Sequence, residues 1–178
     1  MRLMEKYNKE IVPALKEKFG YKNVNAVPKI KKVVLNVGIN SNKKDAKFFD
    51  VVESVLTRIS GQKPVKTRAR KSISNFKIRE GMVVGMMVTL RGKRMYDFLE
   101  KLLSITFPRV RDFRGISTKI IDKQGNLNFG FKEFIAFPEI GVDEVENMHG
   151  VEVSVQSTAG NKEVGEALNR LLGFPFKD

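Results

Sequence analysis

Residues 63 to 79 place seven cations within seventeen positions, and the first acidic side chain after them is Glu80. So many like charges repel one another, so this stretch predicts a surface loop that meets an anion. An apolar run from residue 82 to residue 90 follows at once and is typical of a β-strand. The strand would fix one end of the loop to a core and so present the cations on a rigid scaffold.

The uncharged residues between these cations indicate which anion the loop would meet. Thr67, Ser72, Ser74 and Asn75 can donate hydrogen bonds to phosphate oxygens, and Phe76 can stack on a nucleobase. We therefore favour a nucleic-acid backbone as the partner. A solvated basic loop without a partner is the alternative interpretation.

The charge of the whole chain agrees with a polyanionic partner. Its 178 residues include 33 Lys and Arg against 20 Asp and Glu, which gives a net charge of +13. This balance favours RNA, DNA or an anionic membrane surface over a small acidic substrate. No apolar run approaches the roughly 18 residues of a membrane-spanning helix, and the N-terminus lacks the apolar core of a signal peptide, so we expect a cytoplasmic protein without membrane contact. The absence of Cys excludes disulfides and thiolate metal sites.

Hydrophobic periodicity predicts an α+β fold. Helices are expected over residues 2–19, 44–60, 92–105 and 161–172. Strands are expected over residues 29–37, 64–67, 82–90, 117–121, 127–137 and 151–155. No repeat or linker divides the chain, so we expect a single domain over residues 1–178, with helices packed on one face of one sheet and long basic loops.

Prolines and polar residues should set the limits of these helices. The first helix should bury Met4, Tyr7, Ile11, Leu15 and Phe19. Pro13 should kink that helix or pack at a bend, and Pro108 should end the third helix. Ser41 or Asn42 could cap the N-terminus of the second helix.

Asn36 stands out in the first expected strand because Val34, Leu35 and Val37 surround it. A side-chain amide in such a strand needs a polar partner. The residue is therefore either a satisfied structural group or a binding group that faces out of the sheet, and the strand alone leaves both interpretations open.

Catalytic signals are weak along the whole chain. His149 is the only His, and it lies in a Gly-flanked loop without a second ligand of the usual zinc or catalytic-triad type. We therefore expect a structural or solvent-exposed role for it. The acidic group of Glu139, Asp143, Glu144 and Glu146 lacks the spacing of a calcium loop. An enzyme that acts on RNA or nucleotides is the main alternative function, but it would need a metal-binding carboxylate pair or a His near the basic loop, and the sequence offers neither at a recognisable spacing. We therefore expect no enzyme activity, no cofactor and no metal.

Six segments together resemble one family along nearly the whole chain. They are residues 32–38, 61–81, 88–99, 108–115, 129–133 and 173–176. In these segments the chain is similar to the bacterial large-subunit ribosomal proteins that bind 5S ribosomal RNA, the "L five" family. The resemblance implies an α+β fold with a curved, mainly antiparallel sheet, a place in the central protuberance of the large subunit, and no enzyme activity.

The resemblance also implies three groups of site residues. The group that would bind 5S rRNA is Asn36, Gln62, Lys63, Thr89 and Arg91. The loop that would touch peptidyl-site tRNA contributes Lys71, Ser72, Ser74, Asn75, Phe76, Lys77 and Arg79. An intersubunit bridge to the small-subunit protein S thirteen would use Arg109, Arg111, Asp112, Arg114, Asp143 and Glu144. Large-subunit rRNA and other proteins associated with 5S rRNA are further implied partners.

Two hypotheses follow from these groups. We expect Asn36, Gln62 and Thr89 to converge on one patch of the sheet. We also expect the loop over residues 71–81 to be separable from 5S rRNA attachment, since its cations stand away from the sheet. A free DNA-binding protein is a further alternative, and it would bind duplex DNA as well as 5S rRNA.

Overall fold

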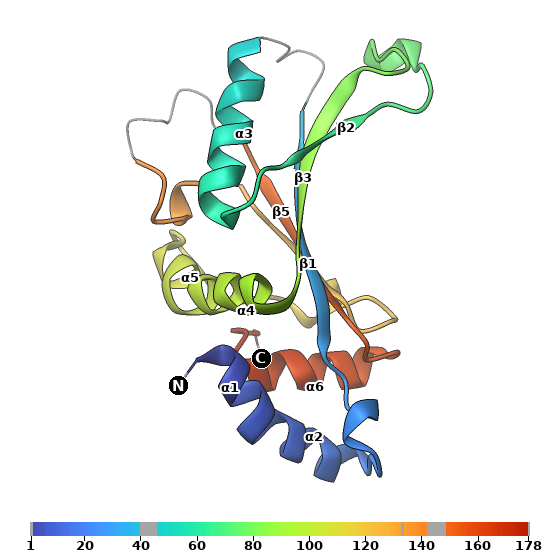
Figure 1. The fold of residues 1–178 in the computed structure, drawn as a ribbon, viewed down its shortest axis with the longest axis vertical. Coiled ribbons are helices and arrows are strands. Elements are labelled where there is room, and N and C mark those ends of the chain that lie inside the picture. The colour runs from blue at the N-terminus through green and yellow to red at the C-terminus, as the bar shows by residue number, and fades with distance from the viewer. Residues whose placement is uncertain (1, 40–45, 133, 142–148, 178) are drawn as a thin grey trace. The chain divides into compact units, whose positions relative to one another are not determined.

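The computed structural model describes residues 2–39, 46–132, 134–141 and 149–177 (Figure 1). Its α-helices are α1 Leu3–Lys6, α2 Val12–Phe19, α3 Ala46–Ser60, α4 Gly92–Lys101, α5 Phe107–Arg109 and α6 Lys162–Leu172. Its strands are β1 Ile30–Gly38, β2 Val65–Arg68, β3 Val83–Leu90, β4 Leu127–Phe131 and β5 Val151–Ser157. The strands form one antiparallel sheet in the order β2-β3-β1-β5-β4, which confirms the predicted α+β class. The expected caps Ser41 and Asn42 lie outside the described residues.

Each long strand buries every second side chain. In β1 the side chains of Val33, Leu35 and Val37 are buried, whereas those of Val34 and Asn36 are only half-buried. Successive side chains of a strand point to opposite faces, so one face of the sheet carries the core and the other faces outward. We call this second face the outward face.

Two compact units divide the chain, and each has its own core. The first consists of Met1–Val33, Leu90–Phe129 and Ser154–Asp178, and the second of Val34–Thr89 and Gly130–Val153. In the second unit α3 buries an apolar stripe of Phe48, Val52, Val55, Leu56 and Ile59. Its Arg58 also donates a hydrogen bond to the carbonyl of Glu139.

The first unit holds α1, α2, α4, α5 and α6. The Phe107 ring lies 5.1 Å from the Phe113 ring and 5.5 Å from the Phe129 ring, measured between centroids. Asn161 caps α6 by accepting a hydrogen bond from the Val164 amide at 2.9 Å. In the same unit, α6 approaches the turn at Gly125 so closely that a Cβ on Gly165 would stand 2.4 Å from the Gly125 carbonyl oxygen.

Each of the two helical prolines follows a π-helical turn. A π-helical turn at Tyr7–Ile11 precedes Pro13, and another at Leu102–Thr106 precedes Pro108. The wider i to i+5 turn relieves the clash between a proline ring and the preceding turn, and the missing proline N–H falls in the first turn of the helix that follows. Pro108 therefore does not end the third helical segment, which continues to Arg109.

One of the predicted strands is wrong, and another is shorter than predicted. Residues 117–121 form a 3-10 turn at Thr118–Ile120, in which the Ser117 hydroxyl accepts a hydrogen bond from the Lys119 amide. The strand expected over 127–137 ends at Phe131, and a 3-10 turn follows at Phe134–Ala136. The first helix also differs, since it buries Leu3 and leaves Met4 47% exposed.

Candidate nucleic-acid interface

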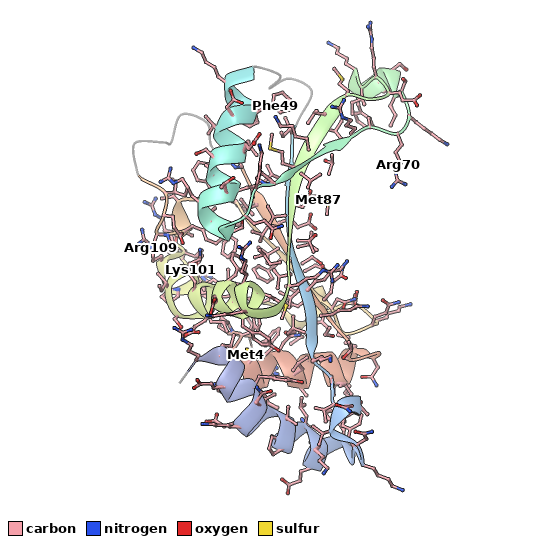
Figure 2. All side chains as sticks on the ribbon, in the orientation of Figure 1. Met4, Phe49, Arg70, Met87, Lys101 and Arg109 are labelled. Atoms are coloured by element: carbon pink, nitrogen blue, oxygen red, sulfur yellow. The ribbon has the colours of Figure 1, made fainter. Side chains whose placement is uncertain are left out.

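Polar side chains gather on the outward face where β1, β2 and β3 lie side by side. Thr67 of β2 stands opposite Gly85 of β3, and Val65 stands opposite Met87. Opposite residues of an antiparallel pair share a face, so Thr67 lies on the same face as Met87 and as Thr89, two residues further along. The position of Met87 on β3 is marked in Figure 2. Asn36 belongs to this face as well, because its neighbours Leu35 and Val37 point into the core.

Gln62 reaches the same strand from the chain segment before β2. Its side-chain Nε2 donates to the backbone carbonyl of Thr89 at 3.4 Å. Asn36 makes its side-chain hydrogen bond across to β5, where its Nδ2 lies 3.3 Å from Oε2 of Glu152. The structure therefore brings Gln62 to Thr89 and leaves Asn36 and Thr89 on a common face.

Lys63 follows Gln62 but turns toward α3. Its ammonium lies 3.4 Å from Oε1 of Glu53, and the ammonium of Lys66 lies 3.1 Å from Oε2 of the same carboxylate. The hydrogen bond from Lys66, with help from Lys63, lowers the pKa of Glu53. Lys63 is thus paired with an acid on α3, and this pair does not belong to the polar group on the outward face.

Arg91 follows the last residue of β3 and is the N-cap residue of α4. Its backbone is extended, with φ −139° and ψ 165°, and its side chain makes no capping hydrogen bond. The residue is exposed, as are Lys93 and Arg94 in the first turn of the helix. A cation in this place is available to a phosphate from outside the chain.

Residues 69–82 form an extension of the β2–β3 hairpin, which we call the basic hairpin. The Ala69 amide donates to the Met82 carbonyl at 2.8 Å, and Ile73 and Ile78 exchange backbone hydrogen bonds of 2.9 and 3.1 Å. The Glu80 amide donates to the Ser72 hydroxyl at 2.9 Å. The predicted long loop is therefore a paired structure with a short tip, which Figure 2 shows with Arg70 extending from it.

The tip of the basic hairpin exposes both charge and apolar surface. A 3-10 turn at Ser74–Phe76 leads into Lys77, which adopts the left-handed conformation with φ 52°. Phe76 is 63% exposed and Ile73 is 45% exposed. All seven residues expected to touch tRNA are exposed, namely Lys71, Ser72, Ser74, Asn75, Phe76, Lys77 and Arg79.

The residues expected at an intersubunit bridge are described only in part. Four of them are exposed and lie at or after the end of α5, namely Arg109, Arg111, Asp112 and Arg114. Asp112 has φ 54°, which turns the chain sharply inside this segment. Asp143 and Glu144 lie outside the described residues.

His149 and the acidic residues form no candidate active site in the described ranges. The His149 ring is buried, 4.5 Å from the Phe134 ring and 6.0 Å from the Phe48 ring. Among the residues that the structure describes, no group of three or more His, Cys, Asp and Glu could hold a metal ion. None of the described helices has the length and apolar character needed to cross a membrane.

Sequence reasoning missed two polar residues of the outward face, Thr67 and Glu152. The local sequence marks Thr67 only as one of the hydroxyls among the cations, and Glu152 only as a residue of the strand expected over 151–155. The alternation of Val151, Glu152 and Val153 already predicted that the carboxylate points away from the core. Its position beside Asn36 depends on the pairing of β1 with β5, which no local pattern predicts.

Comparison with family models and with curated proteins gives the same family in each case. The family described as "Ribosomal protein L5" matches residues 23–79, and the model for the C-terminus of the same ribosomal family matches residues 83–176. The chain is 52% identical over 174 residues to "Large ribosomal subunit protein uL5" of Halothermothrix orenii, covering 98% of this chain and 97% of the relative. Proteins of the same name from Thermoanaerobacter sp. and Roseiflexus sp. are 51% and 50% identical, over 98% and 99% of this chain and 98% of each relative.

Proposed function

Because the chain belongs to the ribosomal protein L5 family, we propose that it binds 5S rRNA and attaches it to the large subunit in the central protuberance. Members of this family are structural, non-enzymatic proteins of the large ribosomal subunit, which in bacteria works in the cytoplasm. This chain is accordingly a constituent of that subunit and of the translation machinery.

The single observation that carries the proposal is the set of uncharged polar side chains on the outward face. Asn36 and Thr89 project from β1 and β3, and Gln62 is held to the backbone of Thr89. Amides and hydroxyls on a rigid sheet can read the shape and the edges of folded RNA. The exposed guanidinium of Arg91 adds a phosphate contact, and the ammonium of Lys63 can add another at the expense of its pair with Glu53.

The basic hairpin supports a second contact, with peptidyl-site tRNA. Its exposed cations supply affinity for a phosphate backbone, and the exposed ring of Phe76 offers a stacking surface. The backbone pairing of Ile73 with Ile78 holds this tip in shape before any partner arrives. Less ordering entropy is then lost when the tip binds RNA.

The exposed segment after α5 supports a third contact, a bridge to the small-subunit protein S thirteen. Arg109, Arg111 and Arg114 carry its positive charge, with Asp112 among them. Asp143 and Glu144 would contribute the acidic part of the same bridge. Large-subunit rRNA and neighbouring proteins that bind 5S rRNA complete the proposed set of partners.

A competition gel shift tests the central proposal. The purified chain is bound to labelled 5S rRNA and challenged with unlabelled 5S rRNA, an unrelated structured RNA of similar length, and duplex DNA at one fixed salt concentration. We expect 5S rRNA to compete at far lower concentration than the other two, because specific binding exceeds charge-driven binding. Equal competition by duplex DNA would support the free DNA-binding protein instead.

A further inference from the structure

We propose that the C-terminal tail, residues 174–177, is part of the surface that residues 109–115 present to a partner protein. We call residues 109–115 the arginine loop. The tail holds this loop in shape and adds the ammonium of Lys177 to its charges. This inference rests on the proposed bridge to the small subunit, and it assigns to that contact a segment from the other end of the chain.

Two backbone hydrogen bonds join the tail to the end of the arginine loop. The Ile116 amide donates to the Pro175 carbonyl at 2.7 Å, and the Lys177 amide donates to the Ile116 carbonyl at 2.9 Å. Ile116 and Phe176 thereby form an isolated parallel bridge. Because Ile116 is buried, loss of the tail would leave its amide and its carbonyl without partners. The tail therefore fixes the place where the arginine loop ends.

Aromatic packing anchors the loop and the tail in one cluster. The Phe113 ring of the loop stacks on the Phe107 ring, with centroids 5.1 Å apart and an angle of 30° between the ring planes. The buried Phe174 ring of the tail meets the same Phe107 ring at 6.2 Å. Aromatic pairs of this kind stabilise a structure beyond the area that they bury. Both segments are thus fixed to a common core within the first unit.

Gly115 allows the tail to lie directly against the loop. Its φ is 87°, and a Cβ at this residue would stand 3.0 Å from Cγ of Lys177 and 3.1 Å from the Lys177 amide nitrogen. A larger residue would therefore be strained and would press on the tail. The Lys177 side chain consequently begins beside the residue that follows Arg114, and both of these cations are exposed.

The exposed charges of this surface have both signs. Its cations are Arg109, Arg111, Arg114 and Lys177. Asp112 is exposed among them, at the turn where φ is 54°. A continuous phosphate backbone would be repelled by this carboxylate, and the one ring of the loop, Phe113, is stacked on the core instead of being free for a base. The pattern fits a protein surface that offers carboxylates to the guanidinium groups and a cation to Asp112.

Subunit association tests the contribution of Lys177. Large subunits that carry variants of this chain are titrated with wild-type small subunits at limiting magnesium, and association is followed by light scattering. Lys177→Ala should weaken association roughly two- to fivefold, the effect of one exposed charge pair. Lys177→Glu should weaken it further, and Lys177→Arg should not. Lys123→Ala makes the same charge change at an exposed position of the same unit, and it should have no effect.

A deletion tests whether the tail holds the loop in shape. Removing residues 177 and 178 leaves the net charge as it is but breaks the hydrogen bond to the Ile116 carbonyl. We expect weaker association than with Lys177→Ala, and faster hydrogen exchange of the Ile116 amide in the free chain. Binding of 5S rRNA by the free chain should not change. Association no weaker than that of Lys177→Ala, together with unchanged exchange, would refute the holding role.

Asp112→Asn distinguishes a protein partner from RNA. Asn adopts the left-handed conformation as Asp does, so the substitution changes only the charge. Phosphates would bind more tightly once the carboxylate is gone, whereas a protein that offers a cation should bind less tightly. Tighter association of Asp112→Asn would assign this surface to RNA and overturn the inference.

Arg111→Ala separates the inference from the proposed bridge. This substitution removes a guanidinium of the arginine loop itself, so it should also weaken subunit association. If it does, and Lys177→Ala associates like the wild type, Lys177 takes no part in the contact and the inference is wrong while the proposed bridge stands. If neither variant weakens association, the proposed bridge fails and the inference fails with it.

Discussion

Gly85 lies in β3 where no side chain larger than hydrogen fits. A Cβ built at this residue would stand 2.7 Å from the backbone carbonyl oxygen of Val37 and 3.0 Å from the hydroxyl oxygen of Thr67. The first of these atoms belongs to the neighbouring strand β1, and the second to the residue opposite Gly85 on β2. Gly85→Ala must therefore displace one of the two adjoining strands.

The expected cost follows from two opposing effects. Overpacking of a tightly packed site destabilises a protein by about 1–3 kcal/mol. Gly→Ala in a compatible backbone stabilises by about 0.4–1 kcal/mol, because the unfolded chain loses freedom. The difference leaves a net loss of about 1–2 kcal/mol for Gly85→Ala. In a chain of this size each kcal/mol corresponds to about 2–4 °C, so the thermal midpoint should fall by about 2–8 °C.

Gly130→Ala is the matched control. Gly130 also lies in a strand, and the nearest atom to its Cβ position is the Val151 carbonyl oxygen at an ordinary 3.8 Å. Only the stabilising effect should then remain, and the midpoint should rise by about 1–4 °C. Thermal unfolding followed by circular dichroism measures both variants under one set of conditions. Shifts of the same sign and size in the two variants would refute the argument from the close approach of β1 and β2.

Four further predictions concern the site and the fold. The first replaces three hairpin cations by Gln, at Lys71, Lys77 and Arg79. The free energy of unfolding should change by no more than about 0.5 kcal/mol, and the salt dependence of 5S rRNA binding should not change. Mutant ribosomes should retain peptidyl-site tRNA less well. A slope of log K against log salt concentration that is reduced by about three would contradict the separation of the hairpin from 5S rRNA binding. Replacing Asn36 or Thr89 by Ala should cost about 1–3 kcal/mol of 5S rRNA affinity in a filter-binding titration, and unchanged affinity would assign these side chains a structural role. Burial, with a smaller effect of Tyr96, raises the pKa of Tyr7 from 10.0 to about 12. The stability that the protonated Tyr7 hydroxyl contributes should therefore be full below pH 10 and be lost between about pH 10 and 12. In urea unfolding from pH 7 to 12, the free energy of unfolding should fall less at alkaline pH in Tyr7→Phe than in the wild type. We also propose that residues 1–178 unfold as one domain, so that calorimetry should give a single transition with equal calorimetric and van't Hoff enthalpies, and two resolved transitions would separate the two units.

The strands that could be predicted from the sequence are those whose local pattern agrees with their environment. β1, β3 and β5 alternate between buried and half-exposed positions, and each lies within two residues of its expected limits. Residues 117–121 have strand-like composition, but the Ser117 side chain bonds to the backbone two residues on and turns the chain instead. The backbone pairing within the basic hairpin, for which the sequence predicts only a loop, is hidden for a related reason. Its tight turn places Lys77, rather than Gly or Asn, in the left-handed conformation, so the usual turn signal is absent.

The residue types that make up the site could be predicted from the sequence, but their contact partners could be predicted only in part. Asn36 and Thr89 carry polarity at positions whose alternation points outward, and this much is local information. The hydrogen bond between Asn36 and Glu152 joins residues 116 apart in sequence. The ion pair between Lys63 and Glu53 depends on how α3 lies against β2. Such partners follow from strand order and helix placement, which a single sequence does not specify.

The π-helical turn at Tyr7–Ile11 sets the rotational phase of the N-terminal helix. In an uninterrupted α-helix each residue turns by about 100°, so Met4, seven positions before Ile11, would lie within about 20° of it, and Leu3 would lie about 80° away. The wide turn uses an extra residue to complete its rotation, so Leu3 takes the inward place and Met4 is left outside. The turn therefore works like a one-residue insertion that the helix has absorbed. Deleting a single residue within it would rotate everything before it by about 100°, which would bring Met4 to the inward side and move Leu3 away from it.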